Sequence, residues 1–276
     1  MRPILSCVTT LAFLVVAGAA TAVAQPPVIT PGGIVNAASN QTPVALGSLV
    51  SIYGTNLSPQ TDVAPTVPLP ITIDGVKVLV NNVLAPLQLV SSGQINAQIP
   101  WEALPAGPPT TNTSATVIVT TLAGGQSVSA NVTIGPAGPG IFTFNYGIGQ
   151  AVAYSNGDGA IASATPIANY PYHAAKIGDP LSLVIYATGL GAVSPAVQSG
   201  NVPPTGVIAN TVTTPTVLVG GVAAQVLFSG LTPQFPGFYQ LNVVIQPGTP
   251  TGSAVPLQIQ MGAVTSPNTV TIAVSN

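Results

Sequence analysis

The chain has 276 residues, of which 47% are hydrophobic and 3% are charged, with 29 glycines and 29 prolines. Three positive charges exclude a basic groove for nucleic acid, which would need clustered lysine and arginine. The apolar content excludes a disordered chain, and a single cysteine excludes an internal disulfide.

Residues 1–24 predict a secretory signal peptide that is cleaved before Gln25. Arg2 supplies the positive charge, an apolar run extends to Ala20, and the small residues Ala22 and Ala24 follow at the two positions that a signal peptidase recognises. The alternative is a membrane anchor, but the run is short for a span and does not end in charge. We therefore expect a bacterial protein that is secreted or held at the cell surface, with no membrane span after cleavage. Removal of Arg2 and Cys7 would leave two lysines against five acidic residues, a net charge of −3.

The elements that follow are short β-type runs bounded by glycine, proline or asparagine, and helical patterns are nearly absent. Gly124-Gly125 predicts a tight hairpin turn, and residues 156–159, Asn-Gly-Asp-Gly, predict another. The spacing of the runs is typical of a β-sandwich. In chain order, strands are expected at 48–53, 76–80, 115–121, 127–134, 181–187, 216–219, 224–228, 239–245, 254–260 and 269–274.

The sequence also repeats itself. Residues 52–57 match 185–190 at an offset of 133, whereas Gly75-Val76 matches Gly221-Val222 and residues 94–99 match 240–245 at an offset of 146. Three motifs in the same order indicate a tandem duplication, with a net insertion of 13 residues in the second copy near 194–215. The period is that of a whole sandwich domain rather than a solenoid repeat.

These patterns predict an all-β chain of two tandem immunoglobulin-like sandwiches. The expected boundaries are a signal peptide at 1–24, a first sandwich at 25–135, a connecting segment at 136–175 and a second sandwich at 176–276. The connecting segment is partly β-patterned. We expect it to form a small hairpin packed between the sandwiches, anchored by Phe142 and Phe144.

Residues 47–57 resemble the opening strand of IPT/TIG (transcription-factor immunoglobulin) domains, in which a glycine-rich turn follows the strand. Over 31–276 the chain is similar to a family of uncharacterised C-terminal domains abundant in acidobacterial secreted proteins. The resemblance implies the immunoglobulin-like fold but no activity. The matching motifs are residues 36–39, 68–70, 85–87, 91–96 with 99–101, 139–142, 186–191, 220–222, 230–231 with Pro233, and 237–242.

Residues that could carry catalysis are scarce. His173 is the only histidine, and a serine hydrolase would need it beside an acid and a nucleophile. It lies in a predicted loop, no nucleophile-elbow motif is present, and an exposed loop histidine is the simpler interpretation. Asp74 and Asp179 have turn-forming explanations, so a convergent carboxylate pair is not expected. We expect no catalytic residues and no enzyme activity.

A metal or cofactor is not expected either. Asp158 is the one acid in the Asn-Gly-Asp-Gly window, whereas calcium sites need six or more oxygens from several carboxylates. A plain turn is favoured there, and no histidine–cysteine cluster is available for zinc.

Two sets of uncharged side chains could bind a ligand. The pairs Gln94/Asn96 and Gln240/Asn242 recur in both copies; they form either a recognition strip or amides that satisfy backbone groups in adjacent loops. Trp101, Tyr170 and Tyr172 could form an aromatic platform for a sugar, although Trp101 could instead pack between the sandwiches.

The sequence therefore favours a non-catalytic extracellular module for adhesion, matrix or protein–protein contact, with an unknown protein or glycan as partner. The alternatives are a carbohydrate-binding protein that uses loop aromatics, and an extracellular hydrolase with an unrecognised site.

Overall fold

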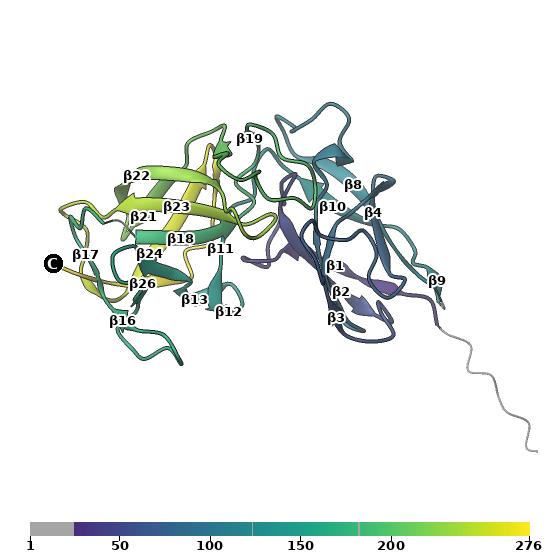
Figure 1. The fold of residues 1–276 in the computed structure, drawn as a ribbon, viewed down its shortest axis with the longest axis horizontal. Coiled ribbons are helices and arrows are strands. Elements are labelled where there is room, and N and C mark those ends of the chain that lie inside the picture. Colours follow the sequence, from purple (N-terminus) through teal and green to yellow (C-terminus); the bar gives the residue numbers. More distant parts are fainter. Residues whose placement is uncertain (1–24, 123, 182) are drawn as a thin grey trace, which may run out of the picture.

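The computed structural model describes residues 25–122, 124–181 and 183–276, and the predicted signal peptide lies outside them. Strands dominate, and they form two sandwich bodies side by side, with β1 to β10 in one and β11 to β26 in the other (Figure 1). The fold is thus all-β and immunoglobulin-like, as predicted. The described part of the chain has no helix with the length and apolar character of a membrane span.

The first sandwich consists of two antiparallel sheets. One has the strand order β1-β2-β7-β6-β3, and the other has the order β10-β8-β4-β5, with β9 paired to β8. A short 3-10 helix, η1 (Trp101–Ala103), follows β7. The strands are β1 (Val28–Asn36), β2 (Leu49–Thr55), β3 (Asp62–Val63), β4 (Lys77–Val80), β5 (Val83–Leu84), β6 (Leu87–Val90), β7 (Gln94–Gln98), β8 (Thr113–Thr121), β9 (Gly125–Gln126) and β10 (Ala130–Ile134).

The first core lies between these sheets because apolar residues alternate along the strands. On β8, Ala115, Val117 and Val119 are buried while their neighbours are partly exposed. They share one cluster with Ile52 of β2 and Ile95 of β7. Successive side chains of a strand point to opposite faces of the sheet, so an apolar residue at every second position gives each sheet one apolar face. The apolar faces of the two sheets pack against each other.

The second sandwich has the same two layers, joined by one long strand. The start of β22 pairs with β21, whereas its remainder pairs with β23 and so belongs to the other layer. Its main strands are β18 (Leu183–Thr188), β21 (Thr216–Val219), β22 (Val222–Leu231), β23 (Tyr239–Val244), β24 (Gly252–Met261) and β26 (Val270–Ser275), with the short β19 (Val193–Ser194), β20 (Asn210–Thr211) and β25 (Val264–Thr265).

The predicted connecting segment differs from the expectation, because its strands pair within the second sandwich instead of packing between the two. β11 and β14 pair with β18, while β13 and β17 pair with β26. These strands are β11 (Gly140–Ile141), β12 (Thr143–Asn145), β13 (Ile148–Ala151), β14 (Ala153–Ser155), β15 (Ile161–Ala162), β16 (Tyr172–His173) and β17 (Ala175–Lys176). We propose that the second module extends over 136–276, since its core begins at Ala137.

The two predicted anchors, Phe142 and Phe144, differ in how they are packed. Phe142 stacks on Phe238, with ring centroids 4.4 Å apart, so it is packed, but against the loop that precedes β23, a partner that the sequence did not indicate. Phe144 is 40% exposed and does not anchor a packed hairpin.

The predicted turns are both present: β9 folds back on β8, and Tyr154 of β14 pairs with Ile161 of β15.

The duplication is visible in the pairing of the strands, but one of the sequence matches is wrong. Val80 pairs with Val83 across Asn81-Asn82, and Val219 pairs with Val222 across Gly220-Gly221. Both two-residue turns have positive φ at both positions, which is the preferred hairpin geometry. Gly221-Val222 therefore corresponds to Asn82-Val83, and its likeness to Gly75-Val76 arises because Asp74-Gly75 forms a similar tight turn.

The corrected match divides the insertion in two. The offset between copies is 133 at Tyr53/Tyr186, 139 at Val80/Val219 and 146 at Asn96/Asn242. Six extra residues thus lie between β18 and β21, and seven lie between β21 and β23. The second group includes much of the loop at 232–238.

Three buried polar side chains bridge the sandwiches. The Asn36 amide donates to the Gly138 carbonyl at 2.7 Å, and the Gln98 side-chain carbonyl accepts from the Gly200 amide at 2.6 Å. The Thr188 hydroxyl accepts from the Leu49 amide at 3.0 Å and donates to the Gly237 carbonyl at 2.8 Å. Because buried polar groups are costly to leave unpaired, these bonds fix one arrangement of the two bodies.

Candidate functional site

The predicted aromatic platform is not assembled as one surface. Trp101 packs against both hydrophobic cores, and its backbone amide donates to Ser199 Oγ at 2.9 Å. It therefore lies at the junction between the sandwiches. Tyr172 begins β16 and Tyr170 lies two residues before it, and β16 is at the far end of the second sandwich (Figure 1).

Tyr170 has an aromatic neighbour, Phe144, which the sequence indicated only as an anchor of the connecting hairpin. Tyr170 is 54% and Tyr172 42% exposed, and the Phe144 ring tilts against Tyr170 with centroids 6.1 Å apart. Phe144 comes from β12, more than twenty residues earlier in the chain, so only the pairing of the strands brings it to this surface. We refer to Phe144, Tyr170 and Tyr172 as the aromatic surface.

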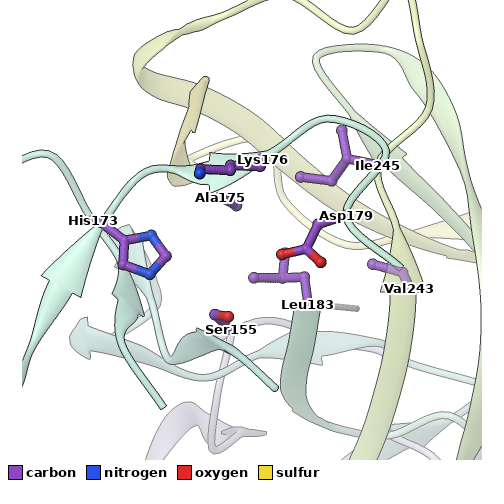
Figure 2. A pocket seen from close by; sticks show the side chains of 8 residues that line it. All are labelled: Ser155, His173, Ala175, Lys176, Asp179, Leu183, Val243 and Ile245. Carbon is purple, nitrogen blue, oxygen red and sulfur yellow. The ribbon is translucent and has the colours of Figure 1, made fainter. Parts of the chain in front are cut away.

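The charged side chains gather in a second place. The described residues include eight Asp, Glu, Lys and His side chains, and four of them line one open hollow: Asp158, His173, Lys176 and Asp179. Figure 2 shows a small adjoining pocket that shares Ser155, His173, Lys176 and Asp179 with this hollow and is also lined by the apolar side chains of Leu183, Val243 and Ile245. This convergence could not be predicted from the sequence, because residues 155–179 belong to four short strands and the loops between them.

The contacts of His173 decide what this charged hollow can do. Its Nε2 lies 2.9 Å from Asp158 Oδ2, and its Nδ1 lies 2.8 Å from the Ala174 carbonyl oxygen. Both partners are hydrogen-bond acceptors, so both ring nitrogens donate when the imidazole carries a proton. The Ala174 carbonyl and then Asp158 raise the pKa of His173.

This arrangement does not suit a serine-hydrolase triad. A general base needs a free lone pair directed at the nucleophile, with the acid on the other nitrogen. In His173 one nitrogen is turned to a carbonyl and the other to Asp158, so neither is directed at Ser155. The pKa of Asp158 is lowered by the Ala160 amide and then by His173, which keeps the carboxylate ionised as an acceptor.

Metal binding has little support in the same place. Asp158 makes the turn contacts predicted for it, since its Oδ1 accepts from the Ala160 amide at 3.0 Å. Within 25–122, 124–181 and 183–276, no three His, Cys, Asp or Glu side chains gather in a way that could hold a metal ion.

In each repeated pair, the glutamine side chain bonds to the asparagine side chain of the same pair. These bonds correct the structural alternative considered from the sequence, in which the amides would satisfy backbone groups in adjacent loops. Gln94 Nε2 donates to Asn96 Oδ1 at 2.7 Å, and Gln240 Nε2 donates to Asn242 Oδ1 at 2.8 Å. Both pairs are half-buried on equivalent strands, β7 and β23. Their repetition therefore follows from a shared strand-surface geometry.

A third hollow lies at the junction itself, with a cavity volume of about 330 Å³. We call it the junction pocket. Its walls come from both sandwiches: Trp101, Glu102 and Pro108 from the first, and Ala192, Val193, Ala196, Val197 and Gln198 from the second.

Comparison with solved structures gives remote similarities. Plexin A4 (full extracellular region) is 12% identical, with 98% of this chain and 20% of that chain covered and a TM-score of 0.28. The Bacteroides ovatus mixed-linkage glucan utilization locus protein SGBP-B, solved with a mixed-linkage heptasaccharide, is 11% identical, with 91% and 47% covered and a TM-score of 0.33. The N-terminal part of the bacterial S-layer protein SbsC is 12% identical, with 92% and 45% covered and a TM-score of 0.23.

The chain spans between a fifth and a half of these three structures, and similarity at this level carries no information about ligands. Among curated proteins no match was found. Comparison with protein families matches residues 34–146 to the IPT/TIG domain. These residues extend from the end of β1 to just past β12 and include most of the first sandwich. Residues 34–146 are thus similar to the IPT/TIG domain, in agreement with the resemblance at 47–57.

Proposed function

We propose that this chain is an exported, non-catalytic binding or structural module that presents two immunoglobulin-like sandwiches in one fixed arrangement to an extracellular protein partner. The observation that carries the proposal is the junction, where Asn36, Gln98 and Thr188 are buried and bonded across it. A fixed arrangement suits a protein that acts by contact. Export rests on the sequence of residues 1–24, and the resemblance to acidobacterial secreted domains supports the same location.

Purification of partners tests this proposal. The chain beginning at Gln25 would be immobilised and exposed to native envelope and medium, and each captured protein would be purified and its affinity measured directly. A reproducible dissociation constant, lost when the junction is disrupted by Thr188→Val, is the expected result. Hydrolytic turnover in broad esterase, protease and glycosidase screens that disappears in His173→Ala would contradict the proposal and favour the hydrolase alternative.

Carbohydrate binding is the second candidate, supported by exposed aromatic rings in a chain with few charges. Tyrosine and tryptophan faces stack on the apolar faces of sugars, while their polar edges bond to hydroxyls. A glycan array tests it: binding that is weakened by Tyr170→Ala or Tyr172→Ala would place the ligand on the aromatic surface. An array without any bound glycan would refute this candidate and leave the first one standing.

A further inference from the structure

We propose that the junction pocket is a binding site for a neutral saccharide, which stacks on Trp101 and bonds to Glu102 and Gln198. This inference rests on the carbohydrate-binding candidate above, but it assigns the ligand to a different place from the aromatic surface. It follows from the shape, the rigidity and the chemistry of the pocket.

The shape is that of a ligand site. A cavity of about 330 Å³ falls within the usual range of small-molecule pockets, and such pockets lie preferentially where two domains meet. Its second wall, around Val193 to Gln198, comes from the segment between β18 and β21, where the second copy has six residues more than the first. The duplication alone would not have produced this wall.

The walls are held in place before any ligand arrives. The Trp101 amide donates to Ser199 Oγ at 2.9 Å, and the Ser199 hydroxyl donates to Glu102 Oε2 at 2.6 Å. The indole packs so closely on Gly47 that a Cβ there would lie 2.1 Å from the ring. A preformed site loses less conformational entropy on binding, which favours affinity.

The chemistry of the lining selects the class of ligand. Small apolar side chains surround one indole ring, the Glu102 carboxylate is exposed with one oxygen not used by Ser199, and the exposed Gln198 amide both donates and accepts. An aromatic face with a carboxylate and an amide at the rim suits a ring with one apolar face and several hydroxyls. Glu102 is the only charged residue of the lining, so uronic acids and sulfated sugars would be repelled.

The chain offers a direct probe of binding, because Trp101 is its only tryptophan. The full exported chain would be titrated with neutral oligosaccharides of glucose, xylose and mannose, and with uronate and sulfated oligosaccharides, while tryptophan fluorescence is recorded. We expect a saturable change with at least one neutral series and none with the anionic sugars. A response of equal strength to the anionic sugars would overturn the proposal.

Variants locate the site. Ala196 is exposed and lines the pocket, so Ala196→Leu should fill it and weaken binding roughly tenfold or more. Ala223, an exposed residue of β22 outside the lining, gives the matched control Ala223→Leu, which should bind as the parent does. Glu102→Gln should allow uronates to bind by removing the repulsion, with an unchanged melting temperature.

The outcomes separate this inference from the functions proposed above. Saccharide binding that is abolished by Tyr170→Ala and unaffected by Ala196→Leu would overturn the junction pocket as the site but keep carbohydrate binding. An absence of saccharide binding, together with capture of a protein partner, would overturn both the pocket and the carbohydrate candidate and keep the first function.

Discussion

Replacement of Thr188 by valine tests whether the buried bonds at the junction hold the two sandwiches together. The Thr188 side chain is fully buried, and its hydroxyl pairs with the Leu49 amide and the Gly237 carbonyl. Valine keeps the shape of the side chain but leaves both backbone groups without a partner. Each unpaired buried group costs about 1–3 kcal/mol, so the free energy of unfolding should fall by roughly 2–6 kcal/mol.

Urea denaturation followed by tryptophan fluorescence measures this loss, because Trp101 lies at the junction. The midpoint should move down by roughly 1–3 M, given a slope of about 2 kcal/mol per M for urea unfolding. Thr216→Val is the matched control: Thr216 is exposed on β21, and its replacement should change stability by no more than about 0.5 kcal/mol. An equally small effect of Thr188→Val would refute the argument that these bonds hold the junction.

Three further predictions concern single sites. Gly47→Ala should cost about 2–4 kcal/mol in denaturant unfolding, because φ is +75° and the new Cβ would meet the Trp101 ring. At the turn between β21 and β22, Gly221→Asn should be nearly neutral, whereas Gly221→Val should cost about 1–2 kcal/mol because φ is +83°. Equal effects of these two variants on melting would contradict the turn geometry. The NMR titration midpoint of His173 should lie above its ordinary pKa and should fall in Asp158→Asn; an unchanged midpoint would exclude the ion pair.

The pKa shifts of that pair also give a direction for stability. His173 has a raised pKa, so its contribution is complete below its unfolded pKa and is lost as pH rises through the folded value. Asp158 has a lowered pKa, so its contribution is present above its unfolded pKa and is lost as pH falls through the folded value. The pair therefore stabilises the contact between the β14–β15 turn and β16 most in mildly acidic solution, and only modestly because both side chains are largely exposed.

The sequence by itself determined the class of fold and most of its strands. Alternation such as that of Ala115, Val117 and Val119 specifies a strand with one buried face, and this requires nothing beyond neighbouring residues. The turns at Gly124-Gly125 and 156–159 were equally local, because glycine and asparagine accept backbone conformations that other residues resist.

Only the tertiary structure decided which strands pair and which side chains meet. The segment 136–175 has strand-like patterns, but these patterns do not indicate which other strands it pairs with. Its assignment to the second sandwich depends on long-range pairing with β18 and β26. The same is true of Phe144 beside Tyr170 and of Trp101 between the two cores. Alternation along a strand specifies which face is buried. Contacts between residues far apart in the chain are instead set by how the sheets pack. The candidate sites consist of such contacts and could therefore be identified only in the folded structure.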